Sequence, residues 1–353
     1  MSRSRPHGIV AGIDVSLKEL VVAWKNRKGE IAEFACPNTA VGHKRLSDLF
    51  GKKKWFSRVV IEATGTFHVD LALHLSATPG VQVMIVNPLA SHRFAQAQMR
   101  RAKTDRVDAR MLLEFAERME FVNWVPPRSA VLDLRALGRH LSRLVAERTA
   151  TMNQIAAMSA TSTTPSFVLE DLAAGAAQVE ARISACQAEA LRVISTDPEL
   201  LAGHMAILTV KGIGDRSAVL LASELAVLDP SMKPDEVVAH AGLDPRPHQS
   251  GTRDGARKTS KVGNARLRGM LFMPTTVAAR FNAPVREWYD GLVARGKPPM
   301  VAYTAVSRRL LRAIWIIYTK RSPWRDELFR PHQKTRRQAP PPEAAPSHVT
   351  SGP

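Results

Sequence analysis

Cysteine, long apolar runs and acidic residues are all scarce in this sequence. The 353 residues include only two cysteines, Cys36 and Cys186, and these lie far apart in the chain. We therefore expect neither a disulfide framework nor a cysteine-type zinc site. The longest late apolar stretch, residues 310–318, contains Arg312 and is too short to span a bilayer. Residues 2–7 are polar and basic, and no uninterrupted apolar segment of a secretory signal follows them, so we expect a cytoplasmic protein.

The shortage of acidic residues leaves a formal net charge of +18. Most of the excess lies in residues 251–337, where 20 Lys and Arg residues outnumber 5 Asp and Glu residues. A basic region of this density is typical of a surface that binds nucleic acid by neutralising phosphates. A solubilising surface is the alternative explanation. A membrane surface is less favoured, because the basic residues do not lie opposite a clean apolar face.

The first third of the chain combines strand and helix patterns. Three strand patterns come first, with Gly29 at the turn between the second and third, and helix and strand patterns then alternate. This order predicts that residues 8–125 form an α/β domain of the RNase H-like class. In that class the first strand, the fourth strand and a late helix bring acidic residues together. The expected strands are 9–15, 19–24, 30–35, 58–62 and 81–86, and the expected helices are 40–49, 67–77 and 105–120.

Pro126 and Pro127 mark a boundary, and residues 126–199 beyond it have helical periodicity. A first helix keeps apolar residues three or four apart, with Arg148 as a polar break, and residues 161–165 interrupt the pattern. A hairpin within one chain and an oligomerising coiled coil fit this segment about equally well. The second helix has an unbroken a/d series that consists of Leu169, Leu172, Ala176, Val179, Ile183, Cys186, Ala190 and Val193.

Residues 200–333 predict a mainly helical C-terminal domain, and the Pro- and Ala-rich residues 334–353 predict a disordered tail. Within this domain, the sequence around Gly212 and Gly214 fits a helix-hairpin-helix motif, in which the glycines permit a tight turn. We expect Asp215 to cap the helix that follows. Such a turn binds a nucleic-acid phosphate without recognising sequence, and a plain helix corner with glycines is the alternative.

Four acidic residues occupy positions suited to a metal site. Asp14 lies in one buried-strand pattern, Glu62 ends a second, and Asp105 and Asp108 begin a helix three residues apart and so share one face. A carboxylate at the end of a core strand is costly unless something binds it. Two divalent cations would satisfy all four acids, and a two-metal site cuts or joins phosphodiesters. Salt bridges to nearby basic residues are the alternative explanation.

Two segments of the basic region carry further candidates. The prolines and glycines of residues 241–251 predict a loop in which Ser250 lies exposed, although a Ser-Gly pair is most often only a turn. Residues 259–268 predict a basic turn that enters a helix. From the glycine turn and these segments we expect phosphate contacts by Lys211, Gly212, Gly214, Arg253, Arg257, Lys258, Lys261, Arg266 and Arg268.

A set of motifs, in order along the chain, resembles one known family. The motifs are Gly12-Ile-Asp-Val-Ser16, Ile61-Glu-Ala-Thr-Gly65, Val86-Asn-Pro88, Lys103-Thr-Asp-Arg-Val-Asp-Ala109, Val210-Lys-Gly-Ile-Gly214, Ala241-Gly-Leu243, Gln249-Ser-Gly251 and Ser260-Lys-Val-Gly-Asn264. Together they resemble the DEDD transposases of the IS-one-ten (IS110) insertion-sequence family over roughly residues 8–320. The sequence departs from that pattern at His68, where an aromatic such as Tyr is common, and at Met99, where Gly is common.

Members of that family are bridge-RNA-guided DNA recombinases. The resemblance implies a RuvC-like N-terminal domain, a coiled-coil middle and a C-terminal transposase domain. It implies that Asp14, Glu62, Asp105 and Asp108 hold Mg²⁺ and that Ser250 attacks the DNA backbone and becomes covalently linked to it. Double-stranded donor and target DNA, a structured guide RNA and dimers that pair into tetramers are the implied partners, and the bacterial nucleoid is the implied location.

Three alternatives stay open at this point. A Holliday-junction resolvase or nuclease of the RNase H class would use a water molecule in place of the serine. A catalytically inactive nucleic-acid-binding protein would not need the acidic quartet, and the presence of all four acids disfavours it. Within the resemblance itself, Ser260 is the alternative to Ser250 as the nucleophile.

Overall fold

The computed structural model describes residues 7–26, 28–51, 56–99, 105–250 and 253–329, and only the backbone of residues 7, 105, 106, 247–250 and 253–258. The predicted disordered tail, 334–353, lies outside these ranges. The chain divides into two compact units, Met1–Pro127 and Arg128–Pro353. The helical segment 126–199 and the region after it thus fall mostly in one unit, and their division into two domains stays a prediction. No helix in the described part of the chain is long and apolar enough to cross a membrane.

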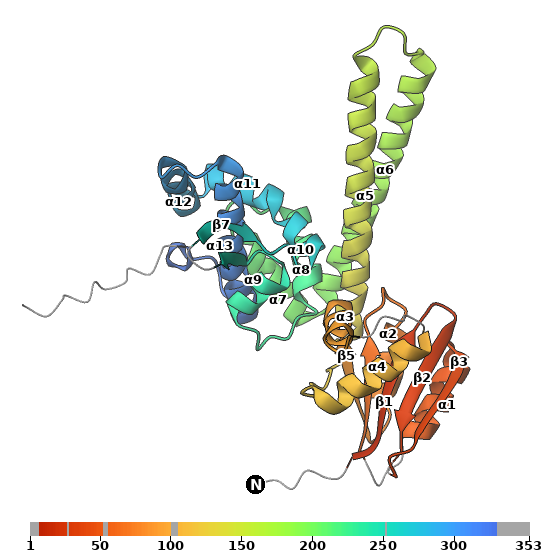
Figure 1. Cartoon of the computed structure of the whole chain (residues 1–353). Helices are drawn as coiled ribbons and strands as arrows, with labels where there is room; N and C mark the ends of the chain where they lie inside the picture. The colour runs from red at the N-terminus through yellow and green to blue at the C-terminus, as the bar shows by residue number, and fades with distance from the viewer. Residues whose placement is uncertain (1–6, 27, 52–55, 100–104, 251–252, 330–353) are drawn as a thin grey trace, which may run out of the picture. The chain divides into compact units, whose positions relative to one another are not determined.

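The N-terminal unit contains a mixed five-stranded sheet of order β3-β2-β1-β4-β5 (Figure 1). The first three strands form an antiparallel meander, and β4 and β5 are added parallel to β1. Gly29 lies in the turn between β2 and β3 with a φ of 87°, which glycine adopts without strain. The strands are β1 (His7–Val15), β2 (Glu19–Lys25), β3 (Ile31–Pro37), β4 (Phe56–Glu62) and β5 (Val81–Val86).

Helices cover both faces of this sheet. Helices α1 (Ala40–Phe50) and α2 (Val69–Ser76) supply apolar side chains to one face, which includes Ile13 and Ile61. Helix α4 (Asp105–Arg118) packs on the opposite face, which includes Val60, and α3 (Pro88–Ala97) lies against α4. The prediction of an α/β N-terminal domain is confirmed. Helix α3 was not expected, although Asn87 caps it and Pro88 begins it, which are ordinary start signals.

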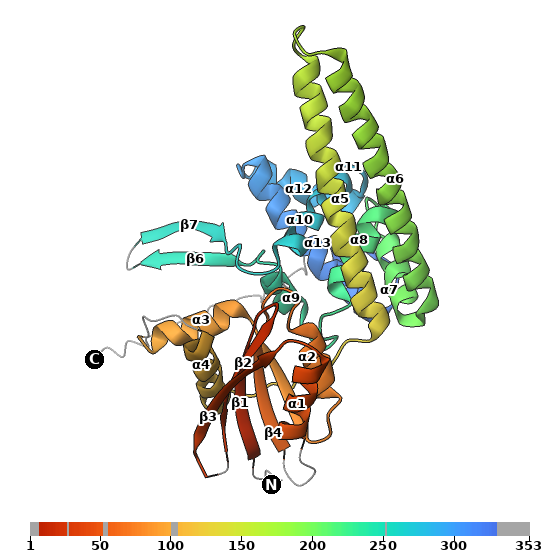
Figure 2. The same ribbon diagram turned by 90° about the vertical axis from the view of Figure 1, so that its right-hand side faces the viewer.

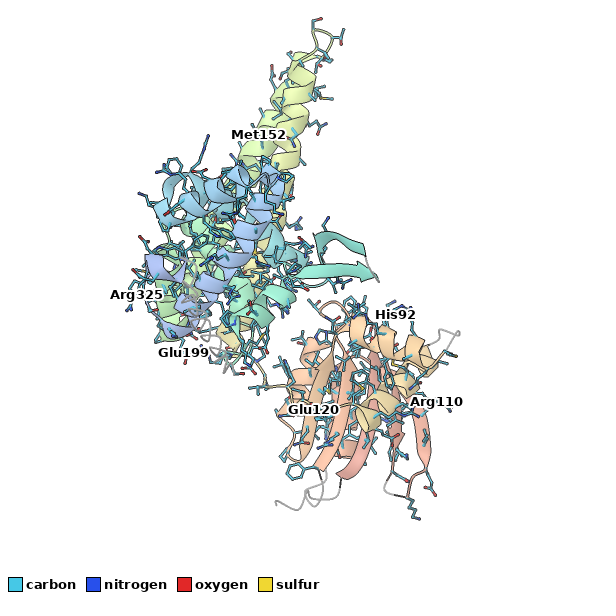
Figure 3. The ribbon with its side chains drawn as sticks, turned by 60° about the vertical axis from the view of Figure 1, so that its left-hand side comes forward. His92, Arg110, Glu120, Met152, Glu199 and Arg325 are labelled. Atoms are coloured by element: carbon cyan, nitrogen blue, oxygen red, sulfur yellow. The ribbon has the colours of Figure 1, made fainter. Side chains whose placement is uncertain are left out.

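The second unit begins with two long antiparallel helices, α5 (Ser129–Ser159) and α6 (Ser166–Thr196), which lie side by side (Figures 1 and 2). In the half of this hairpin near Val131 and Val193, apolar side chains of both helices are buried. None of residues 145–178 is buried, although the apolar series continues through them. Met152, labelled in Figure 3, lies in this outer half and is 47% exposed.

The remainder of the second unit is mostly helical, as predicted, and is built around the long helix α13. Ten residues of α13, among them Leu310, Ile314 and Trp315, are buried. Its core is continuous with that of the hairpin. The helices are α7 (Pro198–Leu208), α8 (Asp215–Leu225), α9 (Pro234–His240), α10 (Ala265–Met270), α11 (Phe272–Phe281), α12 (Ala283–Ala294) and α13 (Pro299–Lys320), followed by a short 3₁₀ turn, Asp326–Leu328.

The expectation of a loop over residues 241–251 is wrong for its second half. Strands β6 (Pro245–Ser250) and β7 (Arg253–Thr259) pair as an antiparallel ribbon that extends away from the helices of its unit (Figure 2). Proline normally argues against a strand, but both strands of a two-stranded ribbon are edges. The pairing also shifts register between Arg246 and His248, so the ribbon is irregular at the proline between them.

Candidate functional site

Two of the four predicted acids come together at the carboxyl ends of neighbouring parallel strands. Strands β1 and β4 pair with Ile13 opposite Ile61, and Asp14 and Glu62 each lie one residue further on. Because side chains alternate along a strand, the two acids share the face of Gly12 and Val60 rather than the face of the two isoleucines. That face carries α4. Both acidic residues are half-buried.

Gly12 lets the backbone of α4 lie directly on β1. A Cβ atom built on Gly12 would lie 2.3 Å from the Leu113 nitrogen and 2.4 Å from the Ala109 carbonyl oxygen. Asp108 immediately precedes Ala109 in α4, and Asp14 lies two residues after Gly12 on the same face of β1. The contact at this glycine therefore brings the first turns of α4, which carry Asp105 and Asp108, to the face that carries Asp14 and Glu62.

The structure describes the side chains of three members of the quartet. Asp14 and Asp108 both take part in polar interactions. Among the described side chains, no three acidic, His or Cys groups lie together closely enough to hold a metal ion. The side chain of Asp105 lies outside those that are described, as do Lys103 and Thr104 of the most specific motif.

Glu62 has a defined hydrogen-bond partner that the sequence did not indicate. The hydroxyl of Ser91, in α3, donates to Glu62 Oε2 over 2.6 Å. Ser91 is 1% exposed, so this bond is shielded from solvent. The one sequence feature that pointed toward Ser91 is its place one turn after the Asn87-Pro88 helix start.

In the second unit, the glycine turn joins α7 to α8, an arrangement that a helix-hairpin-helix motif and a plain helix corner share. Gly212 has a φ of 109°, and a Cβ there would lie 2.7 Å from the backbone nitrogen of Ala278 in α11. Lys211 and Gly214 are exposed. The N-cap of α8 is Gly214 rather than Asp215. Asp215 is the first residue of α8, where its negative charge interacts favourably with the helix dipole. A shallow pocket of about 420 Å³ lies between this turn and α11.

The two candidate serines lie at opposite ends of the β6–β7 ribbon. Ser250 ends β6 at the tip, paired with Arg253. Ser260 follows β7 at the base, where its backbone nitrogen donates to the Asp244 carbonyl over 2.9 Å and its hydroxyl donates to the Asp244 carboxylate. Ser260 is therefore held by interactions that close the ribbon.

The predicted phosphate-binding basic residues differ in their surroundings. Lys261 and Arg266 are exposed near the base of the ribbon. Arg268 is half-buried and donates to the Ala241 carbonyl over 2.8 Å, so part of its hydrogen-bonding capacity serves the fold. The other three, Arg253, Arg257 and Lys258, belong to β7, and their side chains lie outside those described.

A buried ionic group anchors this basic segment to α5 and α8. Glu224 of α8 is fully buried and accepts from Arg139 Nε at 2.9 Å and from Asn264 Nδ2 at 2.8 Å. The Asn264 side chain also caps α10. Burial by itself raises the pKa of Glu224, but the two hydrogen bonds and the charges of Arg139 and Arg135 outweigh burial and lower the pKa.

Comparison with known proteins assigns the family. The model of a DEDD transposase family of IS110 elements, described as "Transposase", matches residues 11–159, and that of the "Transposase IS116/IS110/IS902 family" matches residues 204–290. The pilin gene-inverting protein of Moraxella bovis is 27% identical over 274 residues, which cover 75% of this chain and 81% of that protein. The transposase of insertion sequence IS1328 from Yersinia enterocolitica is 25% identical over 289 residues, or 74% and 84% of the two chains. The chain belongs to the IS110 family of transposases and is a DNA transposase or recombinase.

Proposed function

We propose that the protein cuts and rejoins DNA strands with a Mg²⁺ site in its N-terminal unit and a serine nucleophile in its C-terminal unit. The observation that carries the proposal is the placement of the acids. Asp14 and Glu62 end neighbouring strands on one face of the sheet, and the contact at Gly12 brings the start of α4, the helix that contains Asp105 and Asp108, to that face, which supports a shared site. This strand order and this arrangement support an RNase H-like, RuvC-like fold for the unit.

The residues present fit a Mg²⁺ site by their chemistry. All four donors are carboxylates, the ligand type that Mg²⁺ takes together with substrate phosphates. Because Gly12 has no Cβ atom, α4 lies directly on β1 and its first turns come near the strand ends. Mg²⁺ bound there would stabilise the charge that develops at the reacting phosphate. The carboxylates would hold the cation in position, and the half-buried setting of Asp14 and Glu62 limits access of water.

We assign the nucleophile to Ser250. A serine that attacks a phosphodiester must be able to reach the DNA backbone, and the ribbon tip extends away from the helices of its unit. The hydroxyl of Ser260 is instead engaged by Asp244 at the base of the ribbon. In the attack, the serine oxygen forms a bond to phosphorus as one phosphorus–sugar oxygen bond breaks, and the serine proton ends on the released sugar hydroxyl. A sugar hydroxyl of the second strand then attacks the phosphoserine, which joins the strands and restores the serine hydroxyl.

Rejoining, rather than hydrolysis alone, is supported by the relatives. The Moraxella relative is named for inverting a gene, and an inversion requires each cut end to be joined to a new one. A covalent serine link conserves the energy of the phosphodiester for that second step, whereas attack by water does not. This argument favours a recombinase over the resolvase or nuclease alternative.

Nucleic acid and further subunits are the proposed partners. Exposed Lys211, Lys261 and Arg266 support phosphate binding by the helix-hairpin-helix turn and the base of the ribbon. The absence of any buried residue over 145–178 supports a role for the outer half of the hairpin in dimers and tetramers. Guidance by a bridge RNA rests on the family alone.

The metal assignment is tested by Asp14→Asn and Asp108→Asn in the full chain, with Asp48→Asn on α1 as the matched control. Asp48 is an exposed acid whose partner is Lys44, so its loss leaves the strand ends intact. We expect Mg²⁺-dependent strand cleavage to stop in the first two variants and to persist in the control, while DNA binding is kept by all three. Near-normal cleavage by Asp14→Asn would refute the assignment.

A further inference from the structure

Ser91 is a buried hydroxyl held rigidly beside the proposed metal site. It lies in the second turn of α3, whose start is fixed by Pro88 and by the Asn87 side chain, which accepts from the Leu89 nitrogen over 2.9 Å. Its backbone nitrogen also donates to the Asn87 carbonyl over 3.2 Å. With an exposure of 1%, the side chain has no access to solvent. The hydroxyl therefore has few alternative partners and one well-defined position.

The hydrogen of this hydroxyl goes to the carboxylate of Glu62. Two acceptors lie within reach, Glu62 Oε2 at 2.6 Å and the Pro88 carbonyl oxygen at 3.0 Å. A serine has one hydrogen to donate, and a charged acceptor at the shorter distance binds it more strongly. The bond therefore joins α3 to the end of β4 through Glu62.

The bond has the geometry of a contact that orients a metal ligand. A glutamate side chain has three rotatable bonds, and at a strand end its carboxylate is otherwise free to rotate. Ser91 occupies Oε2 and leaves Oε1 outside this bond. Partners of this kind keep a ligand in its binding orientation, and their loss typically weakens metal binding by about 10- to 100-fold.

We propose that Ser91 is a positioning residue, which holds the Glu62 carboxylate ready for a divalent cation. The inference rests on the proposed function, because it requires Glu62 to be a metal ligand. It goes beyond the acidic quartet by adding a residue from α3, an element outside the strands and helix that supply the four acids. Ser91 does not itself contact the reacting atoms.

The same unit offers a matched control. Ser57, at the start of β4, is 2% exposed, and its hydroxyl donates to the Phe50 carbonyl over 2.8 Å. Ser57→Ala and Ser91→Ala each remove one buried hydrogen bond from the same unit. A merely structural role predicts similar consequences for the two variants. The proposal predicts that only Ser91→Ala affects the metal.

The test measures metal binding directly, with Mn²⁺ as the probe, by calorimetry on the full-length protein. We expect Mn²⁺ affinity to fall by about 10- to 100-fold in Ser91→Ala and to stay within about twofold of wild type in Ser57→Ala. The Mg²⁺ concentration for half-maximal DNA cleavage should rise in parallel, and cleavage should recover at saturating Mg²⁺. Ser91→Cys keeps nearly the same volume with a weaker donor, so its affinity should be intermediate, and it serves if Ser91→Ala does not fold.

Failure of this inference and failure of the metal assignment give different results. Equal Mn²⁺ affinities in folded Ser91→Ala and Ser57→Ala overturn the role of Ser91 but leave Glu62 as a ligand. Glu62→Ala distinguishes the second case. If it binds Mn²⁺ as wild type does, Glu62 is not a ligand, and both the metal assignment and the role of Ser91 are wrong.

Discussion

Replacing Gly12 with Ala should separate the acids without altering any of them. The added Cβ would lie 2.3, 2.4 and 2.6 Å from the backbone atoms Leu113 N, Ala109 O and Leu112 C. Ordinary contacts between such atoms are about 3.5 Å, so α4 must move away from β1 by roughly 1 Å. Overpacking of this kind costs about 1–3 kcal/mol of stability. A displacement of about 1 Å at a catalytic group can lower a rate by about 100-fold.

The assay for Gly12→Ala combines hydrogen exchange with the rate of DNA cleavage. We expect faster exchange in α4 and a rate lowered by about 100-fold, with DNA binding retained. Gly175→Ala in α6 is the matched control, because a Cβ there meets nothing within 4 Å, and it should be neutral or slightly stabilising. A Gly12→Ala protein that cuts DNA as fast as Gly175→Ala would show that the approach of α4 to β1 does not set the site.

Three further predictions concern the second unit. Glu224→Gln should destabilise it by about 3–5 kcal/mol, because Arg139 is left with no opposite charge. The pKa of Glu224 is lower in the folded state, so the ionised carboxylate contributes fully to the free energy of unfolding above about pH 5, and this contribution is lost as pH falls through the folded pKa. Denaturation measured across pH should therefore show a smaller loss of stability at acid pH in Glu224→Gln than in wild type. Burial lowers the pKa of His204 in α7, so the unfolded chain binds a proton more readily than the folded one and wild-type stability should fall as pH drops below about 6.5. Thermal denaturation from pH 7 to 5 should show a smaller fall in His204→Leu. Met152→Asp and Phe167→Asp change exposed residues of the outer hairpin and should weaken self-association in sedimentation experiments without loss of helicity; an unchanged oligomer would place the interface elsewhere.

Much of the fold followed from local sequence patterns. The five strands and the helices at 40–50, 69–76 and 105–118 were predictable because their apolar periods match their elements. The β6–β7 ribbon was not, because its prolines and glycine are turn signals, and only pairing between the two strands stabilises it. The two hairpin helices were predictable, but periodicity is the same in the buried half and in residues 145–178. Periodicity alone therefore does not show which apolar residues of a helix are buried within the chain.

Part of the candidate site was also predictable from local sequence patterns. Asp14 and Glu62 end apolar strands, and Asp105 and Asp108 share a helix face, so spacing alone indicated these acids. Met99, noted as a departure from glycine, has a φ of 56°, which explains why glycine suits that position. Long-range contacts give no such signal. The bond from Ser91 to Glu62 spans 29 residues, and that from Asn264 to Glu224 spans 40.

The most direct measurement of the proposed chemistry is the identity of the residue that becomes linked to DNA. Wild-type protein is incubated with labelled DNA and Mg²⁺, separated under denaturing conditions and mapped by peptide mass spectrometry. We predict a protein-linked DNA band with the adduct on Ser250, and its loss in Ser250→Ala although the protein–DNA complex still forms. Loss in Ser260→Ala alone would move the nucleophile to the base of the ribbon. Free cleaved ends with no adduct in wild type would contradict the serine mechanism.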